Sequence, residues 1–289
     1  MRVLSDVNPI AAFLWLMMTA GIAMFCMDPV ILALSLAGAL VTFALLCGQG
    51  GRAHWYTLGL FLAMALINPL VSHNGVTVLF VMNHNPVTLE ALLYGVAAAA
   101  MVVAVLYWFR CFSSIMTSDK LLYIFGGLSP RLALILSMTL RYVPLFGQQA
   151  KKVKQAQTAL GLYKEDNLID SFRGGMRVFS VMVTWALENG IITADSMTAR
   201  GYGLGKRSRF RLFRWRAGDV LLLTGSLLLA GLALMGVHAR AFTWYPAIAA
   251  APMDALAIAG YGAYGVLTLL PAIIHAKEAI KWHCLISSM

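Results

Sequence analysis

Two carboxylates in the middle of the chain stand at a spacing that could support acid–base chemistry. Glu188 and Asp195 are seven positions apart, so on a helix they share one face. A pair of carboxylates can act as general acid and general base, but no nucleophile or metal-ligand cluster accompanies this pair. The sequence therefore favours ion pairing with nearby arginines, for which the candidates are Arg141, Arg173 and Arg177.

Histidine and cysteine indicate no reactive centre. The six histidines are dispersed, and a metal site between His73 and His84, which flank one loop, is the minor alternative. The cysteines form no CxxC pair and are expected to be small packing residues; they are Cys26, Cys47, Cys111 and Cys284. The phosphate-binding loop GxxxxGK and the HExxH and GxSxG motifs are also missing from the sequence. We therefore expect no catalytic residue, no cofactor and no metal, and no ATP hydrolysis by this chain itself.

Two predicted helices end in the same kind of tripeptide. One starts at Ser129-Pro130, where Ser suits the N-cap and Pro the first helical position, and ends at Ala159-Leu160-Gly161. The second is expected from about Met176 to Arg200 and ends at Ala199-Arg200-Gly201, with Gly201 as a left-handed C-cap. Such a slender tip can enter a groove on a partner, and the arginine fork suits a carboxylate there. Alternatively, Arg200 only complements the helix dipole and needs no partner.

The elements that carry these tips follow from an apolar composition. The 289 residues are 60% hydrophobic and 12% charged, with a mean hydropathy of +0.77, whereas soluble domains have about 45–50% apolar and about 25% charged residues. Six apolar runs approach the length of about 17–25 residues that crosses a bilayer as a helix. They are Ile10 to Met27, Val30 to Cys47, Tyr56 to Val71, Leu89 to Phe109, Val220 to Val237 and Ala255 to Ile274. We expect the first run to be a retained span rather than a cleaved signal peptide.

The distribution of Lys and Arg predicts the orientation of these spans. If both termini face the cytoplasm, twenty-one of the 22 basic residues lie on that side and only Arg240 lies outside. Seventeen of them fall between Arg110 and Arg216. Two semi-apolar segments there, Leu132 to Phe146 and Val178 to Ala194, could be two more spans, but six basic residues would then face outside. We therefore expect long cytoplasmic helices that lie against or beneath the membrane.

Several smaller patterns concern loops and helix contacts. Turn residues at both ends of Ser72 to Val87 predict a short β-like or re-entrant excursion, and Pro69 and Pro271 are expected to kink their helices. Alanines and glycines at helical spacing from Ala255 to Gly265 allow close packing within this chain or, alternatively, sliding contact with a partner membrane protein. Basic and aromatic residues alternate from Lys206 to Arg216 directly before a span. This favours an anchor on anionic lipid over nucleic-acid binding, so we expect no nucleic-acid partner.

The segment around the second tip resembles a known family. The stretch Trp185-Ala-Leu-Glu-Asn-Gly-Ile-Ile-Thr-Ala-Asp-Ser-Met-Thr-Ala-Arg-Gly-Tyr-Gly is similar to the signature of the T component of energy-coupling-factor transporters, the CbiQ-like family. Upstream, Leu140-Arg-Tyr-Val-Pro and Lys154-Gln-Ala-Gln-Thr-Ala-Leu-Gly fit the preceding part of the same pattern. The resemblance covers essentially the whole chain and is most specific in the second motif.

The resemblance implies a function and two kinds of partner. A T component binds two ABC ATPase subunits through two coupling helices that end in Ala-Arg-Gly-like motifs, and it holds a separate substrate-binding membrane protein, the S component. Closure of the ATPases shifts the coupling helices, and the S component topples and releases a vitamin or a transition-metal ion. By this analogy Arg200 enters the groove of one ATPase. Leu160 departs from the arginine of the family, so the other docking site would rest on apolar contact or on Lys164, which suits an asymmetric ATPase pair.

These observations predict an all-α polytopic membrane protein with about six transmembrane helices and an inserted cytoplasmic coupling-helix domain. The expected domains are residues 1–110 with four spans, 111–216 with the two long helices, and 217–289 with two spans and a cytoplasmic tail. The predicted function is that of the energy-coupling subunit of an ATP-driven micronutrient importer in the cell membrane. The alternative, a stand-alone secondary transporter, is disfavoured because the spans carry almost no ionisable residues. The expected ATPase-docking residues are Ala159, Leu160, Gly161, Ala199, Arg200 and Gly201.

Overall fold

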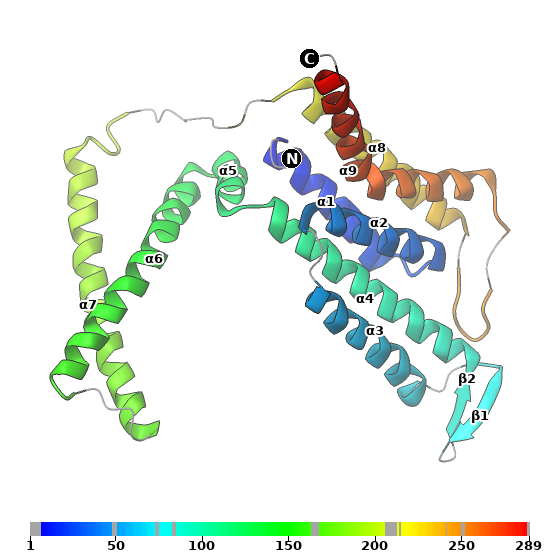
Figure 1. Cartoon of the computed structure of the whole chain (residues 1–289), viewed down its shortest axis with the longest axis horizontal. Helices are drawn as coiled ribbons and strands as arrows, with labels where there is room; N and C mark the ends of the chain where they lie inside the picture. Colours follow the sequence, from blue (N-terminus) through cyan, green and yellow to red (C-terminus); the bar gives the residue numbers. More distant parts are fainter. Residues whose placement is uncertain are drawn as a thin grey trace. The chain divides into compact units, whose positions relative to one another are not determined.

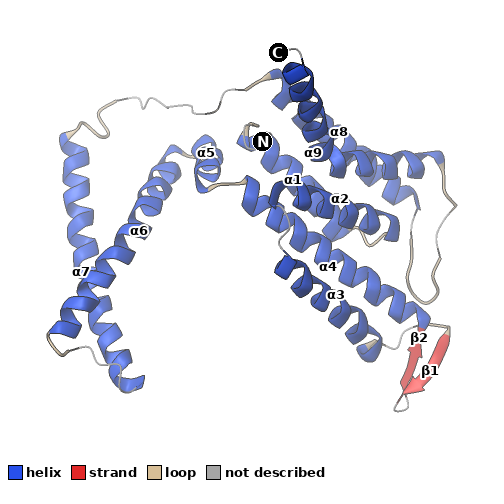
Figure 2. Ribbon diagram, in the orientation of Figure 1, coloured by secondary structure: helices blue, strands red, loops and turns tan. Residues whose placement is uncertain are grey.

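Helices form nearly all of the chain in the computed structural model (Figures 1 and 2). The structure describes residues 7–47, 51–72, 75–82, 85–162, 168–205, 213, 215–240, 242–249 and 252–287. Contacts divide the chain into two compact units, one of residues 1–120 with 213–289 and one of residues 121–212. Helix α5, Ser118–Leu128, crosses the boundary between them.

The first unit contains the apolar helices. They are α1 (Pro9–Phe25), α2 (Pro29–Cys47), α3 (Gly51–Val71), α4 (Leu89–Ile115), α8 (Ala217–Arg240) and α9 (Ala255–Ser287). Five of these, α2, α3, α4, α8 and α9, are long and apolar enough to cross a membrane, and α1 with 17 residues is a shorter apolar helix. The chain is therefore an all-α polytopic membrane protein, as predicted, with one small β-hairpin added. Whether α1 also crosses the bilayer stays a prediction.

Helix α4 lies at the centre of this unit. Helices α1, α2 and α3 pack against it, while α8 and α9 pack on each other and against α1 and α2. Buried aromatic side chains join the helices: Trp108 Nε1 donates to Ser35 Oγ at 3.0 Å, and the Tyr264 hydroxyl donates to the Thr19 carbonyl at 3.1 Å. Water cannot satisfy polar atoms inside hydrocarbon, so these bonds are what allow polar aromatic residues in the core.

The contact between α8 and α9 depends on two glycines. A Cβ atom on Gly236 would lie 2.7 Å from the Cα atom of Gly260, and a Cβ atom on Gly260 would lie equally close to Gly236. The two backbones therefore touch with no side chain between them. The series of small residues in α9 thus packs partly within this chain, with Gly260 and Ala263 buried, while Ala259 remains exposed.

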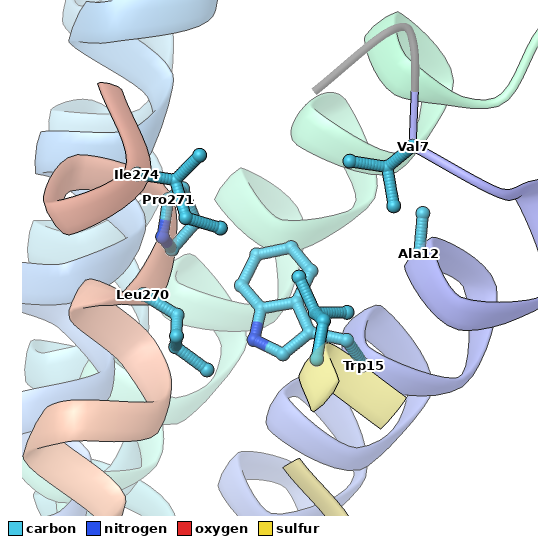
Figure 3. Close-up of a pocket in the computed structure, with 7 residues that line it drawn as sticks. Val7, Ala12, Trp15, Leu270, Pro271 and Ile274 are labelled. Carbon is cyan, nitrogen blue, oxygen red and sulfur yellow. The ribbon is translucent and has the colours of Figure 1, made fainter. Parts of the chain in front are cut away.

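Pro271 interrupts the hydrogen bonding of α9, and Trp15 of α1 compensates. Proline has no N–H, so the carbonyl of Leu267, four residues earlier, loses its helical donor. The Trp15 indole N–H donates to that carbonyl instead, at 3.0 Å. Figure 3 shows the indole directed toward Leu270 and Pro271, beside an apolar void of about 10 Å³. Figure 1 shows that α9 changes direction along its length, as the kink predicted at Pro271 requires.

The loop between α3 and α4 contains the predicted excursion as a β-hairpin. Strand β1, Val78–Met82, pairs antiparallel with β2, Asn85–Thr88. Thr88 then caps α4, because its hydroxyl oxygen accepts the Ala91 N–H at 3.3 Å. The carboxylate of Glu90 in the first turn of α4 accepts the backbone N–H of Thr77 at 3.2 Å. The hairpin is therefore tied to the helix that follows it.

The second unit consists mainly of two long helices, α6 (Pro130–Ala159) and α7 (Leu168–Ala199). The predicted start of α7 at about Met176 is wrong, because the helix already begins at Leu168 and includes two adjacent glycines, Gly174 and Gly175. Glycine weakens a helix interior by only about 1 kcal/mol relative to alanine, so a long helix can include it. Ser129 occupies the N-cap of α6, but its side chain makes no capping hydrogen bond, contrary to expectation.

Helices α6 and α7 run antiparallel and contact each other over a limited region (Figure 1). The Tyr142 and Thr193 hydroxyl oxygens are 2.7 Å apart, and the rings of Phe146 and Trp185 pack edge to face with 5.4 Å between their centres. All other turns are largely exposed: within α6 and α7, which the structure describes completely, only one residue of each helix is buried. This unit therefore has almost no hydrophobic core of its own.

Candidate docking sites at the helix tips

The end of α6 is closed by a Schellman motif. The Leu162 N–H donates to the Gln157 carbonyl at 2.9 Å, and the Gly161 N–H donates to the Thr158 carbonyl at 3.0 Å. Gly161 has a φ of 71°, a left-handed conformation that glycine adopts without the penalty of a Cβ atom. Leu160 is thereby held at the C-cap with 73% of its surface exposed.

The end of α7 repeats this motif. The Tyr202 N–H donates to the Met197 carbonyl at 3.0 Å, and the Gly201 N–H donates to the Thr198 carbonyl at 2.9 Å. Gly201 has a φ of 80°, so its predicted role as a left-handed C-cap is confirmed. Arg200 occupies the C-cap position and is exposed.

The two tips share a backbone geometry but differ in their chemistry. At the C-cap, the α6 tip has Leu160 and the α7 tip has Arg200. Directly after the glycine, the α6 tip has Leu162, with 47% of its surface exposed, and the α7 tip has Tyr202, with 45% exposed. Because α6 and α7 are antiparallel, their C-terminal tips lie at opposite ends of the two-helix unit (Figure 1). Each tip could therefore engage a separate partner.

Electrostatics also separates the tips. The C-terminus of a helix carries partial negative charge, which Arg200 complements. Among the residues that the structure describes, the Arg200 guanidinium forms no ion pair, so its donors remain available to a carboxylate of a partner. The last turn of α6 has no basic residue, and Lys164, the expected compensating cation, lies outside the described residues. The α6 tip is therefore apolar, and the α7 tip is cationic.

The other candidates from the sequence do not assemble into a site. The predicted pairing of Glu188 or Asp195 with arginine is wrong for the described part of the chain, where both carboxylates are exposed and the ion pair that forms joins Asp28 and Arg240. No group of three His, Cys, Asp or Glu in that part could hold a metal ion. Further candidates lie outside the described residues, namely His73, His84 and most of Lys206 to Arg216. Two of the four cysteines, Cys26 and Cys111, are buried.

The sequence analysis identified the two tripeptides but missed the residues directly before and after each of them. Thr158-Ala-Leu-Gly-Leu162 and Thr198-Ala-Arg-Gly-Tyr202 share the pattern Thr-Ala-x-Gly followed by a large apolar side chain. Both threonine hydroxyls donate to carbonyls of the preceding turn, at 2.9 Å from Thr158 and 2.8 Å from Thr198. A large apolar residue directly after the glycine is typical of the Schellman motif, so the repeated pentapeptide is a signal that could have been found.

Comparison with known sequences is decisive for the family. A sequence model of CbiQ, described as "Cobalt transport protein", matches residues 1–212, a stretch that includes both helix tips. This chain belongs to the CbiQ family. The resemblance inferred from the sequence is thereby confirmed.

Several curated relatives align with part of this CbiQ-family chain. "Energy-coupling factor transporter transmembrane protein EcfT 1" of Listeria monocytogenes is 33% identical over 107 residues, which cover 36% of this chain and 40% of the relative. The EcfT protein of Listeria innocua is 36% identical over 103 residues, 35% of this chain and 39% of the relative. The EcfT protein of Lactobacillus helveticus is 30% identical over 118 residues, 40% of this chain and 43% of the relative. The chain thus spans about two fifths of the length of these relatives.

Proposed function

We propose that this CbiQ-family chain is the T component of an energy-coupling-factor transporter. In this role it is a non-catalytic membrane subunit that transmits the motion of two ABC ATPases to a substrate-binding S component, for import of a micronutrient such as a vitamin or a metal ion. The observation that carries the proposal is the pair of exposed helix tips with matching Schellman caps. The relatives named as transmembrane proteins of energy-coupling factor transporters support the same class.

The tips are the proposed ATPase-docking sites. Ala159, Leu160 and Gly161 contact one ATPase, and Ala199, Arg200 and Gly201 contact the other. A Schellman cap holds the last turn rigid by satisfying its carbonyl groups, so a force applied at the tip moves the whole helix. A rigid, slender and exposed end is what a lever needs at its point of contact.

The exposed apolar surface of the second unit supports a need for partners. Large hydrophobic side chains on both helices are exposed, among them Leu132, Ile135, Val143, Phe172, Phe179 and Ile191. When exposed apolar side chains of this kind form a patch, it usually marks an interaction site. We propose that the S component and the membrane surface cover it, in a cytoplasmic coupling domain of residues 111–216.

The proposed orientation places this domain and both chain termini in the cytoplasm. Nearly all Lys and Arg residues then lie on the cytoplasmic side, as the positive-inside rule requires. A cysteine introduced at the exposed Arg200 should then react with a membrane-impermeant thiol reagent only after the membrane is opened. Reaction in intact cells would contradict the orientation.

A co-purification experiment separates the proposed function from a stand-alone carrier. The full chain is expressed together with ABC ATPases from the same genome, purified in detergent, and reconstituted with a candidate S component from that genome. The proposal predicts a stable complex with the ATPases and uptake that requires ATP hydrolysis. Uptake by the chain alone, driven by an ion gradient without ATP, would support the secondary transporter instead.

The difference between the tips predicts two unequal docking sites. Arg200→Ala should abolish assembly with one ATPase, because a partner carboxylate loses its hydrogen-bonded counter-charge, whereas Leu160→Arg should leave both affinities unchanged. Arg131→Ala, which removes an exposed arginine at the other end of α6, is the matched control and should have no effect. Equal losses from Leu160→Ala and Arg200→Ala would count against the asymmetry.

A further inference from the structure

Arg110 lies near the C-terminal end of α4 beside two aromatic rings that contact each other. Its guanidinium carbon is 6.0 Å from the centre of the Phe43 ring and 5.6 Å from the centre of the Tyr107 ring. One of its terminal nitrogens, Nη1, is buried and has no hydrogen-bond partner in the described part of the chain. A cationic donor without an acceptor is unfavourable. Because Arg110 as a whole is partly exposed, the accessible part of its guanidinium suits an anion from outside the chain.

The rings around Arg110 are held in place by three helices. The Tyr107 hydroxyl oxygen of α4 is 2.7 Å from His54 Nδ1 and 2.9 Å from Thr57 Oγ1, both on α3. The Phe43 ring of α2 packs edge to face against His54 and Tyr107, with 5.5 Å and 5.4 Å between ring centres. This network restricts the rings, and the rings in turn restrict the guanidinium plane.

No carboxylate of the described chain supplies the missing charge. Between positions 53 and 109 the only acidic residue is Glu90, at the other end of the same helix. The 20 residues that separate it from Arg110 correspond to a rise of about 30 Å in a helix, which is about the thickness of the hydrocarbon core. Arg110 therefore lies at the level of the lipid phosphates when Glu90 lies at the opposite boundary.

We propose that Arg110, beside Phe43 and Tyr107, binds the phosphate of an anionic membrane lipid. Aromatic rings can cover one side of a guanidinium while its remaining N–H groups donate to phosphate oxygens. The bilayer is the source of this phosphate, because basic pockets between transmembrane helices bind anionic headgroups and the chain itself covers little of α3, with only 11% of its spanning segment buried. The site is independent of ATPase docking, and only its assignment to the cytoplasmic leaflet rests on the proposed orientation.

Lipid-dependent thermal stability tests this site in the purified full chain. Phosphatidylglycerol added to the detergent-solubilised protein is expected to raise Tm, whereas phosphatidylcholine and inorganic phosphate at the same concentration are not. Arg110→Gln should weaken phosphatidylglycerol binding at least tenfold, and Arg110→Lys should weaken it less. Arg131→Gln removes the same charge from an exposed position on α6 and should leave the binding unchanged.

Two outcomes would overturn the proposal. One is an equal rise in Tm for Arg110→Gln and the unaltered chain, and the other is an equal effect of inorganic phosphate, which would indicate a site for a free anion. Native mass spectrometry of the milder variant Phe43→Leu decides the case if Arg110→Gln does not fold. Less retained phosphatidylglycerol than in the unaltered chain supports the site, and an unchanged amount contradicts it.

Discussion

The guanidinium of Arg240 lies 3.7 Å from the carboxylate of Asp28, where the end of α8 meets the turn between α1 and α2. Tyr261 of α9 bridges the pair, since its hydroxyl accepts from Arg240 Nη1 at 3.0 Å and donates to Asp28 Oδ2 at 2.7 Å. The hydrogen bond with Tyr261 raises the pKa of Arg240 further, so this residue stays charged. In the predicted orientation, Arg240 is also the one Lys or Arg residue on the outer side of the membrane. Its pairing with Asp28 neutralises this positive charge.

Removal of the carboxylate should destabilise the first unit. Asp28→Asn leaves Arg240 without its counter-charge while only 11% of the Arg240 side chain is exposed, and breaking a buried pair in this way costs about 3–5 kcal/mol. The measurement is thermal or denaturant unfolding in detergent. Asp254→Asn, at an exposed position in the α8–α9 loop, is the control and should change stability little. Equal stability of the two variants would show that the ion pair contributes nothing.

The glycine contact between α8 and α9 predicts a position-specific effect of alanine. Gly236→Ala places a Cβ atom 2.7 Å from the Gly260 backbone, so the helices must separate, at a cost of about 1–3 kcal/mol. Gly231→Ala, in the same helix with nothing within 4 Å of its Cβ position, should be neutral or stabilising by less than about 1 kcal/mol. The two midpoints of unfolding are compared directly, and a Gly236→Ala variant as stable as Gly231→Ala would refute the close contact.

The bond from Trp15 to Leu267 predicts a coupling with Pro271. Trp15→Phe removes the N–H and leaves the Leu267 carbonyl unsatisfied, which costs about 1–3 kcal/mol. Pro271→Ala restores the helical donor to the same carbonyl, so the double variant should lose less than the sum of the two single variants. A double-mutant cycle by denaturant unfolding measures this coupling. Additivity within about 0.5 kcal/mol would mean that the two donors do not substitute for each other.

Most of the membrane helices could be predicted because hydrocarbon demands long apolar runs and leaves few alternatives. The caps at Gly161 and Gly201 could also be predicted, since a positive φ favours glycine. Contacts between distant residues could not. Trp15 and Leu267 are 252 positions apart and Tyr261 and Asp28 are 233 apart, and nothing local in the sequence joins them. The start of α7 at Leu168 was missed as well, because the ends of a helix are less clearly marked in a sequence than its existence.

At the helix tips the sequence predicted the two tripeptides and their glycine caps, but not the residues that follow each glycine. The departure at Leu160 was visible, whereas Leu162 and Tyr202 became part of the site only when the Schellman bonds placed them beside the C-caps. Both side chains remain about half exposed. A cross-linking group can therefore be placed at Leu162 or Tyr202 to detect a bound partner, while the proposed docking residues stay unchanged.

Photo-cross-linking from position 202 tests the proposed coupling role most directly. A benzophenone amino acid replaces Tyr202, next to the α7 tip, in the complete transporter in membrane vesicles, and a second variant carries it at Leu221, an exposed position on α8. The account predicts a covalent product with an ABC ATPase subunit from position 202, lost when Arg200→Glu is added, and no such product from position 221. A product from position 202 with lipid alone, in vesicles where the ATPases are present and assembled, would contradict it.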